Sequence, residues 1–346
     1  MARVAARRIV IVSDAWHPQV NGVVRTLATV GEELRAMGHA VEVIGPDRFR
    51  TVPCPTYPDI RLALRPGGRL AREIAAFAPD SLHIATEGPL GLAARAWARR
   101  RGYAFTTSFH TKFPEYVAAR IRLPTRLTYA WLRRFHNDGA GLMVATGSLR
   151  ADLAARGFRN LRAWTRGVDL DAFRPTPPDK PREDWGLPRP IFLNVGRVAV
   201  EKNLRAFLDL DLPGSKVVVG DGPLLAALRR AYRAVHFTGA RFGAALARAY
   251  AGADVFVFPS VTDTFGLVLL ESLACGTPVA AFPVTGPRDV LGPAAPPVGA
   301  VDADLRRAAL AALSADRAAC RAHAETYSWR VCADSFLCHL VPLVRA

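Results

Sequence analysis

Short apolar runs alternate with amphipathic segments from the start of the chain to about residue 165. The run "RRIVIV" at 7–12 predicts a strand, and apolar residues at helical spacing follow over 23–38, where Gly38 ends the helix. "AVEVIG", "SLHIAT", "YAFTTS", "GLMVAT" and "LRAWT" predict further strands, with helices such as "GLAARAWARRRG" between several of them. This alternation predicts a parallel sheet with helices on both faces.

A proline-rich, charged stretch at 171–189 has no periodicity, as expected of a linker. Beyond it the alternation restarts, with strands "IFLNVG", "KVVVG", "HFTG", "DVFVFPS" and "PVAAF". We therefore expect an α/β protein of two Rossmann-like, doubly wound domains that face each other across a cleft. The expected parts are a domain at 1–170, the linker, a domain at 190–325 and a C-terminal helix at 326–346 that packs back across both.

The composition excludes several other classes of protein. The chain has 346 residues, which suits two domains of about 150 residues. It has no apolar run of about 18 residues and no signal-peptide pattern, so we expect a cytoplasmic protein without a membrane span. The five cysteines are scattered and form no C-x-x-C pair, which predicts free thiols rather than disulfides or a zinc site.

The net charge of +16 is concentrated in the N-terminal half, where residues 1–170 hold 26 Lys and Arg against 13 Asp and Glu. Such a surface suits a partner with phosphates, either nucleic acid or an anionic membrane, although an arginine-rich composition without one partner is an equal alternative. The segment "RIRLPTRLTYAWLRRF" at 120–135 and "RRR" at 99–101 are basic clusters, and the first interleaves Arg with Leu, Trp and Tyr. That mixture favours a membrane interface over a nucleic-acid groove.

Candidate chemistry lies in the loops after the strands, where open α/β sheets bind ligands. "NVGRVAVEKN" follows a strand: Gly196 permits a tight turn, and Arg197 and Lys202 can converge on one anion at a helix start. The expected anion is a diphosphate, and the alternative is an exposed basic loop with Glu201 paired to a neighbour. "VGDGP" at 219–223 is a common turn and is expected only to form a wall.

The N-terminal half offers three such loops. In "SDAWHPQVNGVV", Gly22 opens a helix and allows close approach of a ligand, and Asp14 ends the strand; a turn capped by Asn21 explains the loop equally well. The absence of G-x-G-x-x-G argues against a nicotinamide enzyme. "TEGPLG" adds Glu87, and "TTSFHTKFPEY" adds His110 and Lys112. A lone histidine is more often structural than catalytic.

Two carboxylates mark the stretch "VTDTFGLVLLESLACGTPVAAF". Asp263 lies in the loop before an apolar helix, and Glu271 lies within that helix, eight positions later. A carboxylate can accept two hydroxyl hydrogens, as in recognition of a sugar diol. Because the two are too far apart to form a dyad, we expect them to bind different parts of one elongated ligand. The alternative for Glu271 is a solvated helix surface, which its apolar neighbours disfavour.

Five segments together resemble one enzyme family. They are "DAWHPQVNGV" (14–23), "RGVDLDAFRP" (166–175), "GRVAVEKN" (196–203), "GDGP" (220–223) and "FPSVTDTFGLVLLESLACGTPVA" (258–280). Their order and spacing resemble the retaining nucleotide-sugar glycosyltransferases of family 4, which have the GT-B fold. The family's E-x7-E motif maps onto Asp263 and Glu271, with aspartate in place of the first glutamate.

The resemblance implies roles for the candidate residues on the donor side. Arg197 and Lys202 would bind the donor diphosphate and stabilise the leaving group, and Glu271 would hold the ribose hydroxyls. Asp263, with the backbone of Phe265 and Gly266, would hold the donor sugar. Gly22 would lie on the phosphate side of the N-terminal loop, and His110 matches the family's active-site histidine near the transferred sugar, which implies a catalytic role. Gly196 is also expected to contact the donor.

The resemblance also implies a mechanism and an acceptor. Configuration would be retained through front-face attack by the acceptor hydroxyl, and we expect neither a metal, because no Asp-x-Asp motif is present, nor a cofactor. The N-terminal segments look most like enzymes that glycosylate diacylglycerol with glucose, glucuronate or sulfoquinovose, and like mannosyltransferases that use GDP-mannose. The acceptor, a lipid or glycan, would lie near Asp14, Glu87 and Lys112, with the enzyme peripherally bound to the inner face of the membrane.

Two other functions remain possible from the residues. A nucleotide-sugar epimerase or hydrolase can share the two-domain shape, and such an enzyme would turn over its donor without an acceptor. A basic nucleic-acid-binding protein would account for the charge, but it leaves the strand-end motifs without an explanation. We therefore expect no nucleic-acid partner.

Overall fold

The computed structural model describes residues 5–19, 21–54, 57–115, 124–177 and 185–344. The chain divides into two compact units, Met1–Thr165 with Trp329–Ala346, and Arg166–Ser328. The division falls after Thr165, whereas the sequence predicted the domain boundary at residue 170. Residues 178–184 of the expected linker, and 116–123, which include the start of the basic cluster 120–135, lie outside the described residues.

The first unit is built on a six-stranded sheet with the order β2-β1-β5-β6-β7-β8, in which every pairing is parallel. The strand over Arg8–Val12 is buried along its last four residues, as expected of an apolar run in a sheet that helices cover on both faces. The order reverses between β1 and β5, which makes the carboxyl ends of those two strands the topological switch point. The strands are β1 (Arg8–Val12), β2 (Ala40–Ile44), β5 (Ser81–Ile84), β6 (Thr106–Phe109), β7 (Gly141–Val144) and β8 (Leu161–Ala163).

Helices of the first unit connect these strands and bury one apolar face each. Leu27, Val30 and Leu34 of α1 are fully buried, as the helical spacing predicts. The helices are α1 (Gly22–Ala36), α2 (Gly67–Phe77), α3 (Pro89–Arg101), α5 (Thr125–His136), α6 (Gly147–Ala155) and α14 (Trp329–His339), with a 3-10 turn η1 (Pro46–Arg48). The pattern did not predict α2 and α5.

An antiparallel hairpin, β3 (Thr51–Cys54) with β4 (Tyr57–Ala63), also went unpredicted. None of the β3 residues is buried. A strand without a buried side lacks the alternation of apolar and polar positions on which such predictions depend. The proline-rich sequence of this passage hid the hairpin further, because proline is confined to edge strands.

The second unit has its own six-stranded sheet with the order β11-β10-β9-β12-β13-β14, again parallel throughout. This is the Rossmann strand order, with the switch point between β9 and β12. The strands are β9 (Ile191–Val195), β10 (Ser215–Val219), β11 (His236–Gly239), β12 (Val255–Phe258), β13 (Val279–Ala281) and β14 (Gly299–Val301). Its helical elements are η2 (Val200–Lys202), α7 (Leu204–Leu208), α8 (Leu225–Ala231), α9 (Gly243–Gly252), α10 (Leu267–Ala274), α11 (Thr285–Leu291), α12 (Leu305–Ala312) and α13 (Arg317–Glu325).

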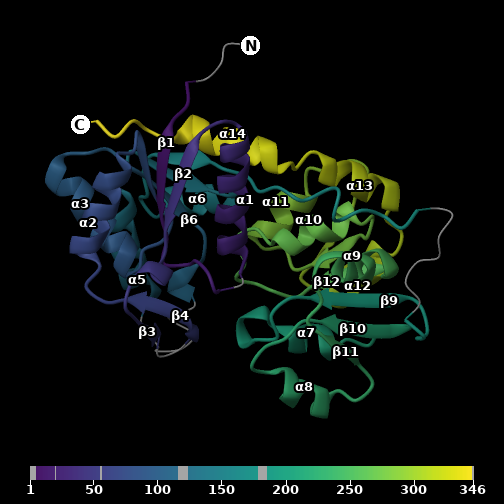
Figure 1. The fold of residues 1–346 in the computed structure, drawn as a ribbon. Helices are drawn as coiled ribbons and strands as arrows, with labels where there is room; N and C mark the ends of the chain where they lie inside the picture. Colours follow the sequence, from purple (N-terminus) through teal and green to yellow (C-terminus); the bar gives the residue numbers. More distant parts are fainter. Residues whose placement is uncertain (1–4, 20, 55–56, 116–123, 178–184, 345–346) are drawn as a thin grey trace. The chain divides into compact units, whose positions relative to one another are not determined.

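The C-terminal helical segment is divided between the two units. Asp304 and Asp316 cap the N-termini of α12 and α13, which belong to the second unit. The last helix, α14, belongs to the first unit, where it packs against α1 (purple and yellow in Figure 1). The buried Trp164 indole fixes α14 by donating a hydrogen bond from Nε1 to the Cys332 carbonyl at 3.1 Å. The five cysteines are free thiols.

Candidate functional site

The loops that follow β9 and β10 in the second unit support each other backbone to backbone. Gly196 N donates to Val219 O at 3.0 Å, and Val198 N donates to Asp221 O at 2.9 Å. Gly220 has φ +155°, and a Cβ there would lie 1.8 Å from the Gly196 carbonyl oxygen. The "GDGP" turn is therefore the support on which the loop carrying Gly196 and Arg197 rests, and its first position requires glycine.

An ion pair joins the two loops that flank the switch point of the second unit. Lys202 ends η2 after β9, and Asp263 follows β12. The Lys202 ammonium donates to both carboxylate oxygens of Asp263, at 2.7 and 2.8 Å. The side chains remain 28% and 17% exposed, so both are within reach of solvent. The cation expected to bind the diphosphate and the carboxylate expected to bind the sugar thus lie together.

Asn203 holds the Lys202 loop in place. Asn203 adopts the left-handed conformation with φ +52°, which ends η2 and starts α7. Its side-chain amide donates to the Pro259 carbonyl at 3.1 Å, directly after β12. Arg197, in the same loop, is exposed. The hydrogen bond from Asn203 to Pro259 joins the loops at the ends of β9 and β12, so the position of Lys202 depends on both strands.

Glu271 is almost completely buried, with 3% of its surface exposed. It is the fifth residue of α10, and its neighbours Leu270 and Leu273 are fully buried. The hydroxyl of Tyr250, on α9, donates to Glu271 Oε2 at 3.0 Å. The alternative of a solvated helix surface is therefore wrong, and the carboxylate is held by a specific partner inside the unit.

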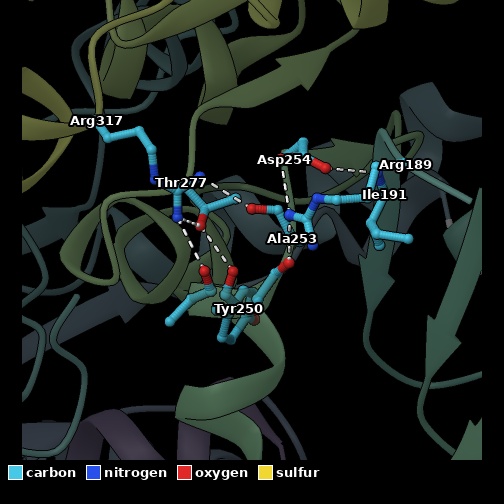
Figure 2. Close-up of polar contacts among 9 residues, drawn as sticks. Arg189, Ile191, Tyr250, Ala253, Asp254, Thr277 and Arg317 are labelled. Carbon is cyan, nitrogen blue, oxygen red and sulfur yellow. Dashed lines mark hydrogen bonds and ion pairs between the residues drawn. The ribbon is translucent and has the colours of Figure 1, made fainter. Parts of the chain in front are cut away.

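The end of α9 that carries Tyr250 is itself fixed by two side chains (Figure 2). Thr277 Oγ1 donates to the Tyr250 carbonyl at 2.7 Å, just before β13. Arg317 donates to Thr277 Oγ1 at 3.1 Å and to the carbonyls of Ala251 and Ala253 at 3.0 and 2.9 Å. These bonds satisfy carbonyls that a helix end leaves without partners, so that Tyr250 presents its hydroxyl from a rigid helix end.

The start of α10 is shaped by a close backbone contact. Gly266 has φ +89°, and the Phe265 side chain is only 5% exposed, so its backbone is what this turn can offer a ligand. A Cβ on Gly286, in α11, would lie 2.4 Å from the Phe265 carbonyl oxygen.

Two hydroxyls missed by the sequence interpretation follow β12 and β13: the Ser260 and Thr285 oxygens are buried and make no hydrogen bond with any described residue.

In the first unit, Asp14 is a structural cap. Its carboxylate accepts hydrogen bonds from Leu90 N at 2.8 Å, Gly91 N at 3.2 Å and Thr86 Oγ1 at 2.9 Å, which satisfies the N-terminus of α3. Burial raises the pKa of the Asp14 carboxyl, although these three hydrogen bonds oppose the rise. A Cβ on Gly88 would lie 2.5 Å from the Asp14 carboxyl carbon, which explains the glycine in "TEGPLG". Contact between Asp14 and an acceptor stays a prediction.

Gly22 and Glu87 lie at the same switch point. Gly22 is the first residue of α1, and Asn21 Oδ1 caps this helix by accepting from Val23 N and Val24 N, each at 3.0 Å. The cap and an exposed Gly22 are therefore compatible. Glu87 Oε1 lies 3.0 Å from Nε2 of the buried His136, a residue that sequence reasoning missed because it lies 49 positions away.

His110 follows β6, at the same edge of the sheet. Its Nε2 lies 2.8 Å from Ser108 Oγ, and its ring meets the Trp164 ring edge to face at 5.6 Å. Lys112 is half-buried two positions later. The structure thus places all five candidate residues of this unit in loops or helix starts that follow β1, β5 and β6, and their contacts with ligands stay predictions.

Family models match both units of the chain. The model described as Glycosyltransferase Family 4 matches residues 20–172, and that described as Glycosyl transferases group 1 matches residues 189–315. Among solved structures, sucrose-phosphate synthase from Thermosynechococcus elongatus has a TM-score of 0.70 at 21% identity, covering 95% of this chain and 97% of its own. HepE from Anabaena in complex with UDP and glucose has a TM-score of 0.68 at 13% identity, covering 96% and 98%.

Curated relatives carry the similarity at the level of sequence. A GDP-mannose-dependent alpha-mannosyltransferase from Mycobacterium tuberculosis is 35% identical over 308 residues, covering 83% of this chain and 82% of the relative. An alpha-monoglucosyldiacylglycerol synthase from Streptococcus pneumoniae is 31% identical and covers 79% and 70%. Sulfoquinovosyl transferase SQD2 from Arabidopsis thaliana is 33% identical and covers 75% of this chain but 56% of its own. The two Rossmann-like units form the GT-B fold, and the chain belongs to glycosyltransferase family 4.

Proposed function

We propose that this glycosyltransferase moves a hexose from a nucleoside-diphosphate sugar to a hydroxyl of a membrane lipid such as diacylglycerol, with retention of configuration. The observation that carries the donor half is the placement of Lys202, Asp263 and Glu271 around the switch point of the second unit, where Rossmann-type sheets bind nucleotides. The relatives named for GDP-mannose, glucosyldiacylglycerol and sulfoquinovose support both the nucleotide-sugar donor and the lipid acceptor. The donor is of the UDP-glucose, UDP-glucuronate or GDP-mannose type.

The Lys202–Asp263 ion pair can open to the donor without leaving either charge unpaired, because each side chain gains a new partner on the donor. When the donor binds, the Lys202 ammonium leaves the Asp263 carboxylate and pairs with the diphosphate. Asp263 then accepts hydrogen bonds from the sugar hydroxyls. Arg197 adds a second cation from the same loop, and the Ser260 and Thr285 hydroxyls are donors without a protein partner among the described residues. Glu271 holds the ribose diol, and Gly22 and Gly196 allow close approach to the phosphates.

The departing nucleoside diphosphate determines the chemistry. Cations that lie where negative charge develops stabilise the transition state more than the ground state. Arg197 and Lys202 can supply this charge, so we expect turnover without a divalent metal. The acceptor hydroxyl attacks the anomeric carbon on the same face from which the leaving group departs. The bond from that carbon to the phosphate oxygen breaks, the hydroxyl proton passes to the leaving phosphate, and the configuration is retained. His110 lies beside the transferred sugar.

An exposed amphipathic face on α5 supports a membrane acceptor. Leu127 and Trp131 lie one helical turn apart and are 53% and 42% exposed, beside exposed Arg126 and Arg134. Apolar and aromatic side chains flanked by arginine are typical of helices that lie in a bilayer interface. Among the described residues, no helix combines the length and apolar character needed to cross a membrane. We therefore propose peripheral binding to the inner face through α5, with the acceptor side near Asp14, Glu87 and Lys112.

Trp131→Glu is expected to weaken binding to vesicles of phosphatidylglycerol and phosphatidylcholine by at least about tenfold, because inserting a large apolar side chain contributes about 1.5–3 kcal/mol. Binding is measured by co-sedimentation over a salt series, and wild-type binding should fall as salt rises. Val331→Glu is the matched control, since Val331 is 53% exposed on α14 of the same unit. Equal losses for both variants, or wild-type binding that ignores salt, would contradict docking through α5.

The donor and acceptor are tested together. UDP-glucose, UDP-glucuronate, UDP-galactose and GDP-mannose are each incubated with the protein, with and without diacylglycerol vesicles, in the presence of EDTA. We expect one donor to yield a glycolipid by mass spectrometry, with retained anomeric configuration by NMR, and only slow hydrolysis when vesicles are absent. Equal turnover without the acceptor identifies the epimerase or hydrolase alternative, and an inverted product overturns retention.

A further inference from the structure

A line of hydrogen-bonded side chains runs from His110 into the sheet of the first unit. His110 Nε2 lies 2.8 Å from Ser108 Oγ, and Ser108 Oγ lies 3.0 Å from Nε2 of His83, on the neighbouring strand β5. His83 Nδ1 lies 2.9 Å from Thr106 Oγ1, which in turn reaches the Leu82 carbonyl at 3.5 Å. Four polar side chains thus connect the candidate active-site edge with the sheet interior.

The inner part of this line is sealed from solvent. His83, Thr106 and Ser108 are each 0% exposed. The His83 ring meets the Phe336 ring of α14 edge to face, with ring centroids 4.8 Å apart. The His83 and His110 rings also meet the Trp164 ring edge to face, with centroids 6.1 and 5.6 Å apart. Burying such polar groups is costly unless each is hydrogen-bonded, so the contacts within the line specify its geometry.

Counting protons restricts the state of the His110 ring. Ser108 has one hydroxyl proton, and its neighbours are His110 Nε2, His83 Nε2 and the Ala85 carbonyl at 3.4 Å. If the proton points to His83, Ser108 accepts from His110 Nε2–H, and His83 Nδ1–H donates to Thr106, whose own proton serves Leu82 O. If it points to Ala85, Ser108 again accepts from His110 Nε2–H. Only a Ser108 proton directed at His110 leaves that nitrogen bare. His83 Nε2–H must then donate to Ser108 and His83 Nδ1 takes the Thr106 proton, so the Ala85 and Leu82 carbonyls both lose their side-chain donors, whereas each of the other two arrangements loses one.

We propose that Ser108 and His83 are positioning residues for His110. They fix the plane of its ring and hold its proton on Nε2, so that Nδ1 is the hydrogen-bond acceptor of the neutral imidazole. In the donor complex this acceptor would serve a hydroxyl of the transferred sugar. That last step rests on the proposed function, whereas the tautomer and its dependence on Ser108 and His83 do not.

The tautomer is tested by long-range 1H–15N NMR of the full-length protein labelled with 15N-histidine, in which His110→Gln identifies the His110 signals. We expect the Nε2-protonated pattern in the wild type and a mixture of tautomers in Ser108→Ala and His83→Leu. His83→Gln offers an amide oxygen to Ser108 and should keep the wild-type pattern. His39→Leu is the control: this other buried histidine accepts from Arg7 N at the opposite edge of the sheet.

Activity supplies the second readout. Ser108→Ala and His83→Leu should lower kcat about tenfold, as the loss of one oriented hydrogen bond implies, with an unchanged KM for the donor. His83→Gln should recover most of this loss, and His39→Leu should leave kcat unchanged. Protonation of His110 at Nδ1, or a wild-type spectrum in Ser108→Ala, overturns the inference. If the spectra change as expected while His110→Gln retains full activity, the positioning stands and the role of His110 in the proposed function fails.

Discussion

Glu271→Ala is expected to raise the KM for the donor roughly 10²–10³-fold while kcat at saturating donor changes little. The carboxylate accepts two ribose hydroxyls in the proposed complex, and hydrogen bonds to a charged group contribute about 1.5–3 kcal/mol each. The ribose does not change during transfer, so this binding is equal in the ground and transition states and appears in KM. Initial rates over a donor series with fixed acceptor vesicles measure the effect.

The burial of Glu271 requires controls for folding. Alanine would leave a cavity and a buried Tyr250 hydroxyl without its acceptor, which costs about 1–3 kcal/mol of unfolding free energy. Glu271→Gln keeps the volume and an oxygen for Tyr250 but removes the charge, so its donor KM should lie between those of the wild type and Glu271→Ala. Tyr250→Phe removes the partner and keeps the carboxylate, and should change KM by less than about tenfold. A folded Glu271→Ala protein with an unchanged KM would show that the ribose assignment is wrong.

The fold was predictable for most elements that have a continuous apolar run or a helical stripe, although α2 and α5 were missed despite their buried faces. The strand from Arg8 to Val12 is buried along its last four residues, and its sequence alone identifies it. The hairpin of β3 and β4 escaped because no residue of β3 is buried, and the short elements α11 and β14 escaped as well. Length also matters: β14 has three residues and α11 seven, which is less than one full pattern window.

The candidate site was predictable as positions but not as partnerships. Parallel strands bring their carboxyl ends to one edge, so a motif that directly follows a strand can be placed there from sequence. Which side chains meet cannot be read in the same way. Lys202 and Asp263 are 61 positions apart, Asp14 caps a helix 76 positions away, and Tyr250 precedes Glu271 by 21. No local pattern links residues at such separations.

Lys202→Met is expected to lower kcat/KM for transfer about 10²–10³-fold, comparable with the loss of one preorganised donor to a developing oxyanion. Methionine preserves most of the aliphatic length but cannot stabilise the departing diphosphate. Because charge on the leaving group grows in the transition state, the loss should be largest in kcat, in contrast to Glu271→Ala. Steady-state rates with the preferred donor, and calorimetric titration with the corresponding free nucleoside diphosphate, measure the two contributions.

Asp263→Asn distinguishes a functional ion pair from a purely structural one. Lys202→Met and Asp263→Asn remove the same ion pair between partly exposed side chains. Such pairs contribute at most about 1 kcal/mol to stability, so the melting temperatures of the two variants should be similar. If Lys202 serves the diphosphate and Asp263 the sugar, Lys202→Met weakens binding of the free nucleoside diphosphate, whereas Asp263→Asn leaves it equal or tighter because the ammonium no longer has a competing anion. Asp263→Asn should instead lose affinity for the intact donor. Equal weakening of nucleotide binding in both variants would mean that the pair acts as one structural clasp between the loops after β9 and β12.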